Sequence, residues 1–349
     1  MKILLAISVV ASITAASPTP TALPTPSCGP SATMPMPGPV ASHVRNSHFE
    51  SGDYAWLRGA FPGASATQTA DWEAISNYSD HCRGAAPALV RAELSSLGEN
   101  PPAGYWDQYA DDVCGELTIA RRTIDGFKNW TDYRRALDVA LPYYESFRFA
   151  VARAEAAAPI GAGSLRDQLQ AIVIPDQMLR SALSWGAGNA INAPDLDPAA
   201  RTVLTKLLWR PIRDIDHRNT AWLKDIIAKN GWPTISKVGE RASSNAWLLV
   251  QHSDDDPVFQ LRVLRMITPL SAQGEVNRKN YALLYDRVML PLTGKQRYGT
   301  QFTCEKRGWH PRALENEANL DNLRSQVGLD TVASYMKRMI DAYGARCPT

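Results

Sequence analysis

The chain has 349 residues, of which 45% are hydrophobic and 21% are charged, and its formal net charge at pH 7 is +2. This composition is typical of a globular protein that is long enough for two ordinary domains. The charge is small and spread out, and no dense Lys/Arg patch with interleaved aromatic residues occurs, so we expect no nucleic-acid partner.

Residues 1–16 have the pattern of a secretory signal peptide. Lys2 supplies the positive charge, residues 3–13 are mostly apolar, and Ala16 offers a small-residue cleavage point. The apolar run is too short to cross a bilayer, and no later segment reaches about 18 uninterrupted apolar residues, so we expect no stable membrane anchor. The predicted localisation is export, either to the periplasm or out of the cell.

Residues 17–42 are rich in Pro, Thr and Ser. A segment of this composition buries too little apolar surface to fold, so we expect a disordered tether.

Helical periodicity covers nearly all of the remaining chain, and strand signals are scarce. We therefore expect an all-α protein with a helical N-terminal domain over 43–160 and a bundle-like helical C-terminal domain over 161–349. The helices expected in the C-terminal domain lie near 165–186, 199–229, 237–252, 257–270, 277–290 and 329–345.

Local signals mark the ends of several expected helices. Ser164 and Asp197 are candidate N-caps, and Asp256 followed by Pro257 has the same pattern. Pro142 falls inside the expected helix 130–158, where we expect it to kink or break the helix.

Five cysteines in an exported chain favour disulfide bonds. From their proximity in the sequence we expect the pairs Cys82–Cys114 and Cys304–Cys347, with Cys28 left over in the tether. Closing the second loop would add about 4 kcal/mol in the chain-entropy account. The alternative is a set of unpaired thiols. No Cys or His pair has the spacing of a structural zinc site, so we expect no metal or other cofactor.

Ionisable side chains interrupt the apolar stripes of four expected helices. In chain order these residues are Asp176 with Arg180, Asp216 with Asn219 beside it, His252, and Asp286. Burying an unpaired charge is costly, so such groups must find partners inside the fold. Either they share a polar pocket, or they form a structural ion-pair network around Asp176, Arg180 and Asp216.

In the pocket hypothesis, His252 is the general acid or base, because its ordinary pKa of about 6.5 is nearest to neutral. Asp216 or Asp254 would orient its imidazole. A small polar or anionic ligand would be held by the remaining polar residues of the stripes and of the loop 295–302. These ligand-binding candidates are Asp176, Arg180, Asn219, Asp286, Arg287, Gln296, Tyr298 and Gln301.

The stretch GWPTISKVGERASSNAWLLVQHSDDD at 231–256, followed by AQGEV, YDRV and QRYGTQF, resembles an uncharacterised bacterial family, the domain of unknown function 6624. The resemblance covers about residues 165–305. It implies a module that also occurs without this N-terminal half, and it implies no particular reaction.

Three functions remain open. The first is an exported hydrolase or lyase that uses His/Asp acid–base chemistry. The second is a non-catalytic module that binds a small ligand or a protein. The third is a divalent-metal site built from His252 with Asp216, Asp254 or Asp286. Serine-hydrolase elbow, P-loop, dinucleotide-binding and HExxH patterns are absent from the sequence.

Overall fold

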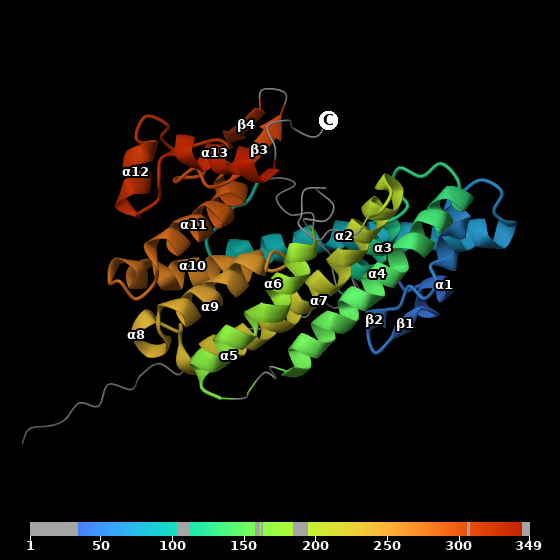
Figure 1. The fold of residues 1–349 in the computed structure, drawn as a ribbon, viewed down its shortest axis with the longest axis horizontal. Helices are drawn as coiled ribbons and strands as arrows, with labels where there is room; N and C mark the ends of the chain where they lie inside the picture. The colour runs from blue at the N-terminus through green and yellow to red at the C-terminus, as the bar shows by residue number, and fades with distance from the viewer. Residues whose placement is uncertain are drawn as a thin grey trace, which may run out of the picture.

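The computed structural model describes residues 34–102, 112–157, 161, 163–183, 195–305 and 308–343. These residues form a predominantly all-α protein with two small antiparallel hairpins (Figure 1). The predicted signal peptide, Cys28 and Cys347 lie outside the described residues. No helix in the described part of the chain is both long and apolar enough to cross a membrane.

The described residues of the N-terminal half form the hairpin β1–β2 and four α-helices. Its elements are α1 (Gly38–Ala41), β1 (Val44–Arg45), β2 (His48–Phe49), the 3₁₀ helix η1 (Ala55–Ala60), α2 (Ala66–Ser96), α3 (Asp112–Arg122) and α4 (Trp130–Ala157). The predicted disulfide Cys82–Cys114 is confirmed and joins α2 to α3. Helix α4 continues through Pro142, so the expected break at this residue does not occur.

Residues 38–41 correct the predicted extent of the tether. They form α1, and the Val40 side chain is fully buried. Val40 packs into an apolar cluster with Phe49 and Ile75, against which Met34 and Met36 also pack. This segment is folded because it packs against apolar residues from later in the chain. Its own Pro-rich composition does not predict these contacts.

The C-terminal half begins at α5, and its described residues are mostly helical up to a second hairpin. Its elements are α5 (Leu165–Ala171), α6 (Val173–Leu183), α7 (Pro198–Asn230), α8 (Ile235–Val238), α9 (Glu240–His252), α10 (Pro257–Ala272), α11 (Arg278–Thr293), β3 (Phe302–Glu305), β4 (Gly308–Pro311), α12 (Leu320–Gln326) and α13 (Val332–Tyr343).

The predicted N-caps are confirmed. Ser164 and Asp167 form a reciprocal capping box at α5, and the Asp197 carboxylate accepts hydrogen bonds from the first amides of α7. Asp256 caps α10 by accepting from the Phe259 amide at 2.8 Å. Each cap satisfies amides that a helix leaves unpaired at its start.

The hairpin β3–β4 was not predicted. Its strands pair Phe302 with Pro311 and Glu305 with Gly308. The strands are only four residues long and alternate little in polarity, so no strand period stands out in the sequence.

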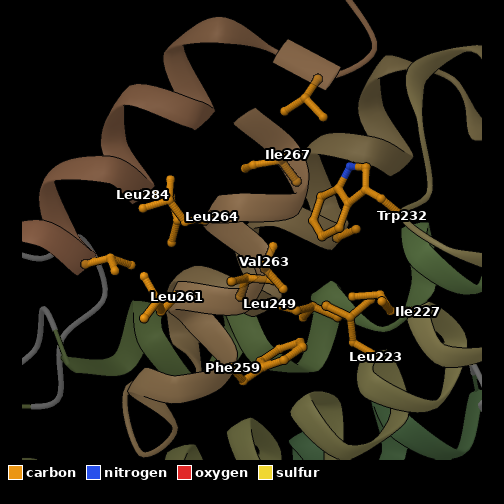
Figure 2. Close-up of a cluster of buried hydrophobic side chains, with 14 of the residues drawn as sticks. Leu223, Ile227, Trp232, Leu249, Phe259, Leu261, Val263, Leu264, Ile267 and Leu284 are labelled. Atoms are coloured by element: carbon orange, nitrogen blue, oxygen red, sulfur yellow. The ribbon is translucent and has the colours of Figure 1, made fainter. Parts of the chain in front are cut away.

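Two large apolar clusters hold the helices together. In one, Leu223 and Ile227 of α7 meet Leu249 of α9 and a row of side chains from α10 and α11 (Figure 2). In the other, Tyr133 and Leu137 of α4 pack with Leu204 and Leu208 of α7. Figure 1 shows α4 and α7 side by side, so the segments on either side of residue 160 share a core.

Candidate functional site

Four of the predicted polar residues meet where α6, α7 and α9 pack together. The Arg180 guanidinium lies at the centre of this cluster. Its Nε is 3.0 Å from His252 Nδ1 and 3.2 Å from Asp176 Oδ1, and its Nη2 is 2.5 Å from Asp216 Oδ1. His252 Nδ1 is also 3.0 Å from Asp176 Oδ1. We call Asp176, Arg180, Asp216 and His252 the charge cluster.

Local sequence features place these groups. Asp176 and Arg180 are four residues apart on α6 and therefore lie on the same helix face. His252 is the last residue of α9, because Ser253 leaves the helix and Asp256 caps the next one. The Ser253 hydroxyl and the Gln260 amide both donate to the Val250 carbonyl, which fixes the helix end that carries the imidazole.

The carboxylate in contact with His252 is Asp176, where the sequence pointed to Asp216 or Asp254. Asp176 is fully buried, and its Oδ2 accepts from Gln177 Nε2 at 2.7 Å. Burial alone would raise the pKa of Asp176, but its hydrogen bond with His252 and the His252 and Arg180 charges lower it. The two contacts of Nδ1 exclude each other, because Arg180 Nε–H donates only to an unprotonated Nδ1, whereas the ionised Asp176 carboxylate accepts only from a protonated one. With the proton on Nδ1, the ring donates to Asp176, and Arg180 Nε has Asp176 Oδ1 at 3.2 Å as its acceptor. The Nε2 lone pair is then free.

The pKa values of His252 and Asp216 are shifted in opposite directions. Burial lowers the pKa of His252, and the Arg180 and Arg287 charges act in the same direction, against Asp176. Burial raises the pKa of Asp216 to about 8, with the Asp176 and Asp254 charges adding to the rise and Arg180 opposing it. Near neutral pH, His252 is therefore mostly unprotonated while Asp216 retains much of its proton.

Solvent reaches part of this cluster. The Asp176 side chain is 0% exposed, whereas the His252 and Asp216 side chains are each 16% exposed and that of Arg180 is 21% exposed. The buried aspartate thus supports three groups that are only partly covered.

Asp254 and Arg287 adjoin the cluster through their charges. Arg287 Nη1 donates to both carboxylate oxygens of Asp254, at 2.6 and 2.8 Å, and Gln260 Nε2 donates to one of them at 3.2 Å. The structure records no direct contact of Asp254 with His252 among the described residues. Asp254 instead influences the Asp216 pKa, and Arg287 the His252 pKa.

Asn219 lies one turn after Asp216 on α7 and is 3% exposed. Residues three apart share a helix face, so its amide is on the Asp216 side of α7. Its Nδ2 has no hydrogen-bond partner within the described part of the chain. Burying a hydrogen-bond donor without an acceptor costs free energy, so the Asn219 amide is a candidate to bind a ligand on this face of α7.

Asp286, Gln296, Tyr298 and Gln301 form a separate arrangement. The fully buried Asp286 carboxylate accepts from the backbone amides of Arg297, Tyr298 and Thr300, at 2.8 to 3.2 Å. Gln296 is fully buried, donates to the Gln301 and Arg312 carbonyls, and accepts from the Gln301 amide. These side chains hold the loop 296–301 on α11, and no contact among the described residues joins them to His252.

Sequence reasoning missed a second ionic network around His217. His217 Nδ1 is 2.6 Å from Asp112 Oδ1, and its Nε2 is 2.7 Å from Asp255 Oδ2. Arg213 also contacts both of these carboxylates. Asp255, in the turn before α10, therefore contacts α7, and His217 and Arg213 of α7 in turn contact Asp112 of α3. The available signal was the pair Arg213 and His217, four residues apart on one helix face.

A family described as "Family of unknown function (DUF6624)" matches residues 165–347. The match begins at α5 and includes the charge cluster, and it extends past the 305 expected from the sequence. No curated protein and no solved structure matches the chain. The geometry of the cluster is therefore the main guide to its chemistry.

Proposed function

Since the chain belongs to the DUF6624 family, for which no reaction is assigned, we propose from the charge cluster that it is an acid–base hydrolase or lyase. Its ligand would be a small polar or anionic molecule. One observation carries the proposal. His252 and Asp216 contact the same guanidinium at 3.0 and 2.5 Å, and their pKa values move in opposite directions from their ordinary values. Such pairs divide the roles of acid and base between two groups.

His252 acts as the base. In the tautomer with the proton on Nδ1, Asp176 accepts from Nδ1–H and holds the imidazole in one orientation. This tautomer leaves the Nε2 lone pair for a proton of the substrate or of an attacking water. Because the His252 pKa is lowered, the lone pair is available at neutral pH. Asp176 is thus a positioning residue, as a buried carboxylate behind a catalytic histidine commonly is.

Asp216 acts as the acid. It retains a proton near neutral pH and delivers it to the leaving group as the bond breaks, while His252 gains a proton on the other side of the reaction. Arg180 offers planar N–H donors to a carboxylate or another oxyanion. Exchange of protons with water returns the two groups to their starting states.

A ligand panel tests this proposal. The full chain and the variants His252→Gln and Asp216→Asn are screened by thermal shift against small carboxylates, amides and sugars, and each stabilising compound is then incubated and analysed for products. We expect wild type to convert a compound that both variants leave unchanged. The matched controls are Asp225→Asn and His43→Gln. Asp225 lies on the same helix as Asp216, but it is exposed and paired with Lys229.

The outcomes separate the alternatives. A compound that stabilises wild type and is recovered unchanged would support a binding module and overturn the enzymatic proposal. Variants that lose stability yet convert the compound as wild type does would show that the cluster is only structural. Controls that behave as the variants do would show a general effect on folding.

A divalent cation at the same cluster is the second candidate. Ligand atoms of Asp176, Asp216 and His252 lie within 4.8 Å of one another. Arg180 contacts all three residues and already supplies positive charge there, so a cation would have to displace it. Elemental analysis of protein purified without chelators checks this. A bound metal that Asp216→Asn abolishes would favour the cation over the acid–base pair.

We also propose that the protein is exported. The signal-like pattern of residues 1–16 motivates the proposal, and the disulfide Cys82–Cys114 supports it because such bonds persist in oxidising compartments. N-terminal sequencing of the mature protein from cell fractions is the test. Recovery of the intact N-terminus in the cytoplasm would contradict export.

A further inference from the structure

A second group of possible ligands lies away from the charge cluster. It consists of His48 on β2, Glu116 on α3 and Asp214 on α7, whose ligand atoms lie within 4.8 Å of one another. Asp214 and Asp216 are two residues apart on α7, which turns their side chains about 200° from each other. The two groups therefore lie on opposite faces of one helix.

Glu116 is a buried carboxylate with weak partners. Its side chain is 4% exposed, yet its contacts are long: 3.2 Å from Oε1 to His48 Nδ1 and 3.4 Å from Oε2 to Arg210 Nη2. Charge-assisted N–H···O bonds are normally about 2.7–2.9 Å. A carboxylate taken out of water with contacts this long lacks the compensation that burial demands.

Arg210 is committed elsewhere. The same Nη2 atom donates to the Phe49 carbonyl at 2.9 Å, which is a better distance than its 3.4 Å to Glu116, and Nη1 donates to the Tyr54 hydroxyl. The guanidinium thus fixes the β2 backbone to α7. It leaves the two acids of the group only partly neutralised.

Asp214 adds a second negative charge without a partner. Its half-buried carboxylate makes no hydrogen bond or ion pair with any residue in the described ranges. Two carboxylates within 4.8 Å of each other repel, and a cation between them would remove this repulsion.

We propose that His48, Glu116 and Asp214 bind one divalent transition-metal ion of the zinc class. An imidazole nitrogen with two carboxylate oxygens suits Zn²⁺, whereas Ca²⁺ and Mg²⁺ prefer oxygen ligands alone. Three protein ligands leave a fourth position for water. The His48 side chain is 56% exposed, so solvent reaches the group at His48. This inference is independent of the proposed acid–base function.

The fold allows the group to close on an ion. Tetrahedral ligands at about 2.0–2.1 Å lie about 3.3 Å apart, so the atoms must approach by up to about 1.5 Å from their present limit. Glu116 is on α3, which the disulfide at Cys114 anchors to α2. His48 follows a tight turn, in which Asn46 and Ser47 both have positive φ, so its exposed ring is the ligand free to move.

The test is titration of the full chain with ZnCl₂ after removal of bound metal, by calorimetry in a non-chelating buffer at pH 7.5. We expect one equivalent to bind to wild type, and His48→Ala and Asp214→Asn each to weaken binding at least tenfold. Because His48 is largely exposed, His48→Ala is expected to fold even where a change at buried Glu116 does not. His43→Ala and Asp225→Asn are matched controls and should bind as wild type does.

Asp216→Asn decides between the two faces of α7. Zn²⁺ binding that survives in Asp216→Asn and is lost in His48→Ala supports the proposed site. Binding lost in Asp216→Asn but retained in His48→Ala would place the ion at the charge cluster and overturn the proposal. Wild type that binds no Zn²⁺, or His48→Ala and Asp214→Asn proteins that bind it unchanged, would overturn it as well.

Discussion

Gly115 of α3 lies directly against Arg213 of α7: a Cβ added to Gly115 would be 2.0 Å from the Arg213 Cζ. The guanidinium cannot move away freely, since Asp112 and Asp255 both hold it. Glycine at this position lets α3 approach the ion network that joins the two halves of the chain. A helical glycine is ordinarily a weak point, so its presence here has a packing reason.

We therefore expect Gly115→Ala to destabilise the protein by about 1–3 kcal/mol, the usual cost of overpacking. At an unobstructed helix position the same change would instead stabilise by about 1 kcal/mol. Urea unfolding measures the difference. Gly38→Ala is the control, because nothing lies within 4 Å of its added Cβ. A Gly115→Ala protein as stable as wild type would show that Arg213 relocates without loss.

His217 should make the stability of the protein depend on pH. Burial alone would lower its pKa, but the hydrogen bonds that His217 donates to Asp112 and Asp255 raise it to about 9, from 6.5. A group with a raised pKa in the folded state stabilises fully below its unfolded pKa and loses this contribution as pH rises through the folded pKa. The loss therefore falls between about pH 6.5 and 9.

The comparison is between wild type and His217→Gln, unfolded with urea at pH 6 and pH 9.5. We expect the stability advantage of wild type to shrink by about 2–3 kcal/mol over this range. An advantage that is equal at both pH values would mean that His217 is not held as a cation between the two aspartates.

The role of His252 as the base of the charge cluster can be tested without a substrate. Burial places the His252 pKa below 6.5, so its imidazole signals in NMR should titrate on the acid side of that value. Asp176→Asn removes a contact that favours the protonated ring and should lower the His252 pKa further. A His252 pKa above 6.5, or one that Asp176→Asn raises, would contradict the assigned roles.

Asp286→Asn should reduce stability and leave ligand binding intact. The amide group keeps one oxygen acceptor where the carboxylate serves three backbone amides, so we expect a loss of about 1–3 kcal/mol. Thermal unfolding and the ligand panel measure the two effects. A variant of normal stability that no longer responds to a ligand would instead assign Asp286 to the binding site.

The pair Cys304–Cys347 stays a prediction, because Cys347 lies outside the described residues. Non-reducing peptide mapping of the mature protein should recover Cys304 linked to Cys347, alongside Cys82 linked to Cys114. The pair Cys82–Cys114 serves as the internal control, because the structure contains this disulfide. A peptide in which Cys304 is linked to Cys28 would disprove the predicted connectivity.

The sequence by itself determined the helical class and most helix boundaries in the C-terminal half. Periodicity and the caps Ser164, Asp197 and Asp256 depend on residues a few positions apart, so they act before any tertiary contact forms. It also grouped Asp176, Arg180, Asp216 and His252, together with Asp286, because polar groups on inward stripes must find partners inside the fold. The sequence did not predict the short hairpin β3–β4, because four-residue strands show little periodicity.

Only the tertiary structure decided which partner each polar group has. Asp176 reaches His252 across 76 residues, and Asp286 turns instead to the backbone of the loop 296–301. Both are aspartates on apolar helix stripes, and the sequence does not distinguish them. Their environments differ because α6 packs against α9, which brings Asp176 to His252, whereas the loop after α11 folds back onto Asp286. Helix periodicity within one segment does not predict such contacts between segments.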